Sequence, residues 1–190
     1  MDFDTLTSYG AMMGSGGVIV MDDRSCMVEV ARYYIEFLCD ESCGKCTPCR
    51  EGLRHLLTIL TDICEGRGQE GDIELMEKIC HTMQDASLCS LGKSAANPVL
   101  TTIKYFRDEY EAHIHEKRCP AGVCPKLTAF VIDEEACRGC MRCSKACPAG
   151  AVSGEVKKPH HIDPVKCIAC GSCREACNFD AVVAVKRGEA

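Results

Sequence analysis

Two cysteine runs with the same internal spacing constrain this 190-residue chain more than any other feature. The first run reads Cys137-x2-Cys140-x2-Cys143-x3-Cys147, and the second reads Cys167-x2-Cys170-x2-Cys173-x3-Cys177. Each cysteine of the first run recurs 30 residues later in the second. The flanks repeat as well, since Ile-Asp precedes each run and Ala-Val follows it. Each half therefore predicts a strand, a cysteine loop, a short helix and a second strand.

The spacing of both runs favours iron–sulfur ligation. Three thiolates separated by two residues can wrap one face of a cubane cluster, whereas the fourth lies beyond the turn and ligates the other cluster. The predicted ligand sets are Cys137, Cys140, Cys143 and Cys177 for one [4Fe–4S] cluster, and Cys167, Cys170, Cys173 and Cys147 for the other. Zinc is the alternative for repeated Cys-x2-Cys pairs. It is less favoured because zinc needs only four ligands, whereas each run supplies four closely spaced cysteines, three of them in one loop.

Two such halves related by a pseudo-twofold axis resemble the bacterial ferredoxin with two [4Fe–4S] clusters. The resemblance implies electron storage and transfer. Residues 129–190 form the predicted ferredoxin-like domain, with about 60 residues, and at this size a core alone is weak and bound metal commonly stabilises the fold. Asn178 stands where the first run has Pro148, which changes the turn after the cysteine but leaves ligation intact.

Composition limits the class of protein. The length predicts one or two domains. Aromatic residues make up 5% of the chain, Trp is absent, and 18 residues are cysteine. The sequence shows no signal peptide and no apolar stretch of transmembrane length, so we expect a cytoplasmic protein without a membrane span, whose thiolates bind metals. The net charge of −6 with no basic footprint argues against nucleic-acid binding.

The chain before residue 116 is predicted to be mostly helical. Residues 1–22 contain Gly14-Ser15-Gly16-Gly17 followed by an apolar run. A dinucleotide-binding loop is excluded because these glycines precede the strand, so we expect an extended segment that enters a buried strand. In residues 23–115, apolar residues recur at helical spacing, among them Leu75 and Phe106, and helices are predicted to begin near Asp23, Thr47, Asp72 and Asn97. The predicted fold class is α+β, with a four-helix bundle before the ferredoxin-like domain.

A third cysteine set lies in the helical region. It reads Cys43-x2-Cys46-x2-Cys49 and is completed by the distant Cys89. Backbone N–H groups at the helix start can hydrogen-bond an anionic cluster there. Cys64 and Cys80 are rivals for the fourth position, but both lie in helical patterns where buried cysteine behaves as a small hydrophobe.

Two segments of the helical region resemble a known family. Residues 41–52 read Glu-Ser-Cys-Gly-Lys-Cys-Thr-Pro-Cys-Arg-Glu-Gly, and residues 87–92 read Ser-Leu-Cys-Ser-Leu-Gly. Both resemble the NADH-binding flavoprotein subunit of respiratory complex I, as does the strand-like segment 14–21. The resemblance implies that Cys43, Cys46, Cys49 and Cys89 hold the [4Fe–4S] cluster that accepts electrons from FMN.

The appended ferredoxin-like domain narrows this resemblance. It is similar to the beta subunits of NAD(P)-linked, often electron-bifurcating [FeFe]-hydrogenases. The family's FMN- and NADH-binding region is absent from residues 1–190, so we expect a fragment without a hydride-transfer site and no catalytic residue of its own. The implied partners are the flavin-bearing remainder of the subunit, other hydrogenase or dehydrogenase subunits, and ferredoxin. The alternatives are a formate dehydrogenase or other NAD-linked complex, and a structural scaffold for partner subunits.

A further metal site is predicted in the linker at residues 116–128. His113, Cys119 and Cys124 suit tetrahedral zinc, with Cys26 or His115 as the fourth ligand. The two histidines are two residues apart, so both cannot face one metal from a helix. The alternative is a surface linker with reduced thiols. Cys39 is interpreted as packing, and the other histidines, His55, His81, His160 and His161, as solvated or packing residues.

Overall fold

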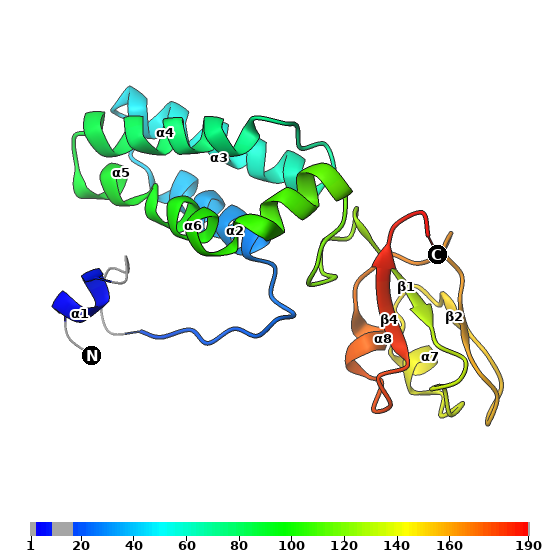
Figure 1. The fold of residues 1–190 in the computed structure, drawn as a ribbon. Coiled ribbons are helices and arrows are strands. Elements are labelled where there is room, and N and C mark those ends of the chain that lie inside the picture. Colours follow the sequence, from blue (N-terminus) through cyan, green and yellow to red (C-terminus); the bar gives the residue numbers. More distant parts are fainter. Residues whose placement is uncertain (1–2, 9–16, 190) are drawn as a thin grey trace.

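The computed structural model describes residues 3–8 and 17–189. A helical part and a smaller part with short sheets are joined by a linker (Figure 1), so the predicted α+β class is confirmed. The helices are α1 (Phe3–Ser8), α2 (Met27–Glu41), α3 (Thr47–Cys64), α4 (Asp72–Ala86), α5 (Ser90–Ser94), α6 (Asn97–Glu111), the π-helix η1 (Ala112–Glu116), α7 (Arg142–Ala146) and α8 (Ser172–Glu175). The strands are β1 (Thr128–Ile132), β2 (Val152–Ser153), β3 (His161–Ile162) and β4 (Val182–Lys186).

The helical part is built from α2, α3, α4 and α6, which share one core. Pro48 stands at the start of α3, where the missing N–H costs no hydrogen bond. Leucines then recur along the buried side of α3, and Leu56 and Leu60 are fully buried. Gly52 lets α4 approach closely, because a Cβ at this position would lie 2.5 Å from Sδ of Met83. The predicted starts of α3, α4 and α6 agree with the structure.

Two features of the helical region differ from expectation. Leu75 was expected on the apolar stripe of α4 but is 46% exposed. Phe106 was expected on the stripe of α6 but has non-helical φ and ψ of −136° and 36°, and its side chain is exposed. The helix therefore kinks at Phe106, and the helical segments before and after this residue have different axes.

The N-terminal region also differs from expectation. The helix α1 was not predicted. Val18, Ile19 and Val20 were expected in a buried strand, but they are exposed and form no strand. The glycines at positions 14 and 16 lie outside the described residues. Among the described residues, no helix combines the length and the apolar character that a membrane crossing requires.

The sheet part follows the 30-residue repeat. β1 pairs antiparallel with β4, and β2 pairs antiparallel with β3. The Asp133 N–H donates to the Ala181 carbonyl at 2.8 Å, and 30 residues later the Asp163 N–H donates to the Ala151 carbonyl at 2.8 Å. Each pair of strands therefore joins one repeat to the other, and a second small core lies between them.

The first prediction concerns the helical core. Leu56→Ala should lower the free energy of unfolding by about 2–5 kcal/mol, because it removes a fully buried side chain and leaves a cavity. Leu75→Ala is the matched control on an exposed face and should change it by less than about 0.5 kcal/mol. Chemical denaturation of both variants measures the difference. Equal losses would contradict the core described above.

Candidate functional site

Two small cavities in the sheet part are lined by cysteines from both repeats. One is lined by Cys137, Cys140, Cys143 and Cys177. The other is lined by Cys167, Cys170, Cys173 and Cys147. In each cavity three cysteines come from one loop and the fourth comes from the other run. The structure thus brings together the two sets of four that the sequence predicts.

The loops that carry these cysteines have matching backbones. Each has three residues with positive φ, at 139, 141 and 150 in the first loop and at 169, 171 and 180 in the second. The N–H of Cys137 donates to the Asp133 carbonyl at 3.0 Å, and the N–H of Cys167 donates to the Asp163 carbonyl at 3.0 Å. Aliphatic residues such as Ile132 and Ile162 complete the walls. Four thiols converging in an apolar cavity fit the donor set of a [4Fe–4S] cluster.

The third cysteine set lies where α3 begins and α5 begins. Cys46 immediately precedes α3, and Cys89 immediately precedes α5. The backbone N–H groups of Leu88 and Cys49 hydrogen-bond the Cys46 thiol and lower its pKa. Gly92 packs against Cys49, since a Cβ at this position would lie 3.1 Å from Cβ of Cys49. The loop that carries Cys89 therefore lies against the Cys43–Cys49 loop.

The two rivals of Cys89 lie elsewhere. Cys80 is fully buried in α4, and desolvation raises the pKa of its thiol to about 12. Cys64 ends α3, at the end opposite to Cys49. An 18-residue helix is about 27 Å long, so Cys64 is too distant to join Cys49. Both thiols therefore lack the position that a fourth ligand requires.

The linker residues meet the start of α2 in a buried tetrad. The ligand atoms of Cys26, His113, Cys119 and Cys124 lie within 4.8 Å of one another, and all four side chains are buried. Nε2 of His113 lies 3.4 Å from Sγ of Cys26 and 3.5 Å from Sγ of Cys124, and the two Sγ atoms are 3.9 Å apart. Ligands in tetrahedral zinc sites lie about 3.5–3.8 Å apart, given the usual zinc–ligand bond lengths. The tetrad fits this donor set.

The π-helix η1 determines which histidine reaches the tetrad. His113 is fully buried, whereas His115 is exposed. Nδ1 of His113 donates to the carbonyl of Glu109 at 2.7 Å, which leaves Nε2 free as a metal ligand. Of the two fourth ligands left open above, the structure brings Cys26 to the tetrad and leaves His115 outside it.

The electrostatics of the tetrad favour one thiolate. Hydrogen bonds from the Cys124 and Cys26 thiols lower the pKa of Cys119. Cys124 donates hydrogen bonds to Cys119 and to Cys64, and these bonds raise the pKa of the Cys124 thiol. Cys64 is thus a fifth thiol beside the tetrad, and the sequence provided no signal for it beyond its place at the end of a predicted helix.

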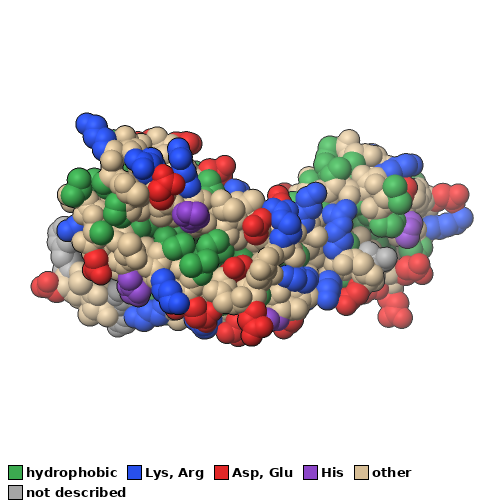
Figure 2. All heavy atoms as spheres, turned by 90° about the horizontal axis from the view of Figure 1, so that it is seen from above, with side chains coloured by type: hydrophobic (Ala, Val, Ile, Leu, Met, Phe, Trp, Pro, Cys, Tyr) green, Lys and Arg blue, Asp and Glu red, His purple; other side chains and the backbone are tan. Residues whose placement is uncertain are grey.

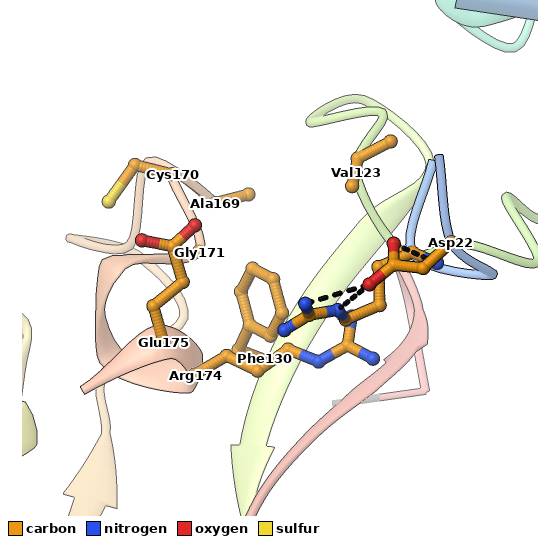
Figure 3. A pocket seen from close by; sticks show the side chains of 10 residues that line it. Asp22, Val123, Phe130, Ala169, Cys170, Gly171, Arg174 and Glu175 are labelled. Atoms are coloured by element: carbon orange, nitrogen blue, oxygen red, sulfur yellow. Dashed lines mark hydrogen bonds and ion pairs between the residues drawn. The ribbon is translucent and has the colours of Figure 1, made fainter. Parts of the chain in front are cut away.

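A larger hollow lies between the two parts of the molecule. Its volume is about 430 Å³, and it is bordered by Asp22 and Arg24 on one side and by Cys170, Arg174 and Glu175 on the other. Nε of Arg24 donates to Oδ2 of Asp22 at 2.8 Å. Figure 3 shows Asp22 on the side of the hollow opposite Cys170 and Glu175. The four charged side chains sum to zero, so the hollow has no preference for an ion of one sign. The exposed thiol of Cys170 lies at its edge.

Basic side chains gather where the two parts meet (Figure 2). Nη1 of Arg174 donates to the carbonyl of Ala121 at 3.1 Å, and Nη1 of Arg187 donates to the carbonyl of Pro125 at 2.7 Å. These hydrogen bonds hold the sheet part against the linker, and each brings a positive guanidinium group to the junction.

One residue of the cysteine cavities was missed by the sequence interpretation. His160 was grouped with solvated or packing histidines, yet it is buried and lines the cavity of Cys137, Cys140, Cys143 and Cys177. A signal did exist, because His160 lies 30 residues after Phe130, which lines the other cavity. His55, His81 and His161 are exposed, as that interpretation allowed.

Each of the two parts matches a known protein family. Residues 29–113 match the NADH-ubiquinone oxidoreductase-F iron-sulfur binding region, and residues 129–178 match a 4Fe-4S dicluster domain. The chain is an iron–sulfur electron-transfer module related to subunits of NADH-quinone oxidoreductases and of hydrogenases. The resemblance to the NADH-binding subunit of complex I and to NAD(P)-linked hydrogenase subunits is thereby confirmed.

Individual proteins similar to this iron–sulfur module are subunits of the same two kinds of complex. It is 43% identical over 183 residues to the NADP-reducing hydrogenase subunit HndC of Solidesulfovibrio fructosivorans, covering 96% of this chain and 37% of HndC. It is 50% identical over 120 residues to an NADH-quinone oxidoreductase subunit of Rhizobium meliloti (strain 1021), covering 63% of this chain and 28% of that protein. The module therefore spans about a third of the length of these relatives.

A solved structure shares the fold of part of the module. The H2-reduced NAD+-reducing [NiFe]-hydrogenase aligns with a TM-score of 0.52 at 35% sequence identity. The alignment covers 55% of this chain and 18% of the hydrogenase chain. This level of identity supports a shared fold and a shared arrangement of the aligned residues.

The second prediction distinguishes Cys89 from Cys80. Cys89→Ser should lower the iron content of anaerobically prepared protein by about four atoms per chain, the content of one cubane. Cys80→Ser, the matched control inside the same helical part, should keep that iron. Iron analysis with EPR of the reduced protein measures both. The grouping of Cys89 with Cys43, Cys46 and Cys49 is wrong if Cys80→Ser loses the iron and Cys89→Ser keeps it.

Proposed function

We propose that the module holds three [4Fe–4S] clusters and connects an FMN- and NAD(P)H-binding part to ferredoxin or to a hydrogenase subunit. A helical bundle carries one cluster on Cys43, Cys46, Cys49 and Cys89. The ferredoxin-like domain carries one on Cys137, Cys140, Cys143 and Cys177 and one on Cys167, Cys170, Cys173 and Cys147. When bound, such clusters supply reversible one-electron storage. The observation that carries the proposal is the pair of cavities, each lined by four cysteines drawn from both repeats.

The residues around each proposed cluster site hold the iron, stabilise the thiolates or exclude water. The cysteines hold iron as thiolates, and the N–H groups of Leu88 and Cys49 stabilise the negative charge on Cys46. In the sheet part, Ile132 and Ile162 exclude water from the cavities. One cysteine of each ferredoxin-like set, Cys140 or Cys170, reaches the surface, as do Cys43 and Cys89. These exposed edges are where a redox partner can approach.

The two ends of the module serve different partners. The bundle cysteines lie at the start of α3, whereas the linker and the sheet part lie beyond its other end (Figure 1). The length of α3, about 27 Å, therefore separates the bundle site from the tetrad. We assign the bundle site to the flavin-bearing part and the ferredoxin-like pair to ferredoxin or another subunit. The positive junction supports an acidic partner such as ferredoxin.

The tetrad completes the proposal as a zinc site. Cys26, His113, Cys119 and Cys124 join the start of α2, the π-helix η1 and the linker, so a bound zinc ion would tie three segments together. The zinc ion would then hold the linker segment that Arg174 and Arg187 of the sheet part hydrogen-bond. This assignment gives zinc a structural role in placing the domain.

The third prediction is the metal content of anaerobically prepared protein. We expect about twelve iron atoms per chain, by four per cubane, and about one zinc ion. Eight iron atoms would remove the bundle cluster from the proposal, and the absence of zinc would remove the tetrad site.

A variant separates the two kinds of site. Cys26→Ser should lower zinc to about zero and leave the iron content unchanged, because a closed structural site needs all four of its ligands. Cys39→Ser, at the other end of the same helix α2, is the matched control and should keep the zinc. A Cys26→Ser protein with full zinc content would show that the ion lies elsewhere.

A further inference from the structure

The two cysteine cavities of the sheet part differ at one buried position. Their linings correspond at the 30-residue offset, so that Ile162 matches Ile132 and Val152 matches Val182. Three pairs of equivalent positions differ, Phe130/His160, Ala149/Phe179 and Ile168/Arg138. The first is the pair that is buried in both cavities, with Phe130 beside Cys167 and His160 beside Cys137. Both side chains are buried, at 5% and 3% exposure. One cavity therefore has a hydrocarbon ring where the other has an imidazole.

The imidazole of His160 is enclosed on all sides. Its ring packs on Gly154, where an added Cβ would lie 2.6 Å from Cγ of the ring. Nε2 lies 3.0 Å from Sδ of Met141, which follows Cys140 in the cluster loop. Nδ1 is buried and has no hydrogen-bond partner among the described residues. A buried ring nitrogen without a hydrogen-bond partner is destabilising. A bound group that hydrogen-bonds Nδ1 would therefore stabilise this arrangement.

A bound cluster would supply that partner. The sulfur atoms of a thiolate-ligated cluster carry negative charge and accept hydrogen bonds, and such bonds are known to set cluster potentials. The thioether of Met141 is a weak acceptor, so the stronger acceptors in the cavity determine which ring nitrogen carries the proton. Phe130 has no donor to offer at the equivalent position.

We propose that His160 donates Nδ1–H to a sulfur of the cluster held by Cys137, Cys140, Cys143 and Cys177, and thereby makes this cluster easier to reduce than its pseudo-symmetric twin beside Phe130. Reduction adds negative charge, which a fixed N–H dipole stabilises more than it stabilises the oxidised form. A second difference acts in the same direction, because Arg138 lines this cavity where Ile168 lines the other. Arg138 is exposed, so solvent and salt screen its contribution. The proposal rests on the proposed function, since it requires both clusters.

The fourth prediction is tested by EPR-monitored redox titration of the full chain. His160→Phe should shift the reduction equilibrium of one cluster about tenfold toward the oxidised form, which corresponds to about 59 mV for a one-electron couple. Phe130→His should shift the equilibrium of the other cluster toward the reduced form by a similar factor. His161→Phe is the matched control, because His161 is adjacent but exposed, and it should shift neither cluster.

A spectroscopic measurement accompanies the titration. In pulsed EPR of the reduced protein with 15N-labelled histidine, wild type should show a nitrogen coupling that His160→Phe loses and His161→Phe keeps. Iron-loaded His160→Phe with unchanged midpoints would overturn the proposal. If His160→Phe does not load iron, Phe130→His decides alone, and an unchanged midpoint in that variant would overturn it. Wild-type protein without reducible iron would instead overturn the proposed function itself.

Discussion

The exchange of one cysteine between the two repeats is the constraint on which the sheet part depends. Each cavity takes three thiols from its own loop and one from the other run, so neither half has a complete site alone. The same exchange appears in the backbone, where β1 pairs with β4 and β2 with β3. Because the core of this part is small, the proposed metal ligation would reinforce the strand pairing. The 30-residue repeat is thus one cooperative unit with two sites.

The helical part also carries cysteine sets, but its own core does not depend on them. Its core of α2, α3, α4 and α6 is large enough to be stable, and it presents cysteines at both ends. The starts of α3 and α5 hold one set, and the tetrad lies where η1 and the linker meet the start of α2. The kink at Phe106 and the π-helix redirect the chain so that His113 turns inward while His115 stays outside. Under the proposed function, the helices separate the bundle site, which we assign to the flavin-bearing part, from the linker to the sheet part.

Local patterns in the sequence predicted the features that depend on neighbouring residues. The cysteine spacing predicted which cysteines would lie together in the sheet part. Apolar periodicity and helix-capping residues predicted the starts of α3, α4 and α6, and the 30-residue repeat predicted strands in each half. Features set by contacts between distant residues could not be obtained in this way. Cys26 and His113 are 87 positions apart, so the sequence offered Cys26 only as one of two candidates for the fourth ligand, beside His115. The burial of His160, the exposure of Leu75 and the absence of a strand at Val18–Val20 likewise depend on tertiary packing.

The central claim is that the three cysteine sets hold clusters that transfer electrons, in addition to any role of these clusters in stabilising the fold. A stoichiometric reductive titration of anaerobically prepared protein, followed by EPR, tests it most directly. The account predicts that each chain takes up about three electrons reversibly, one per cluster, with the spectrum of interacting paired spins from the ferredoxin-like pair. Clusters that are present at full iron content but take up no electrons would contradict the account and favour a structural scaffold.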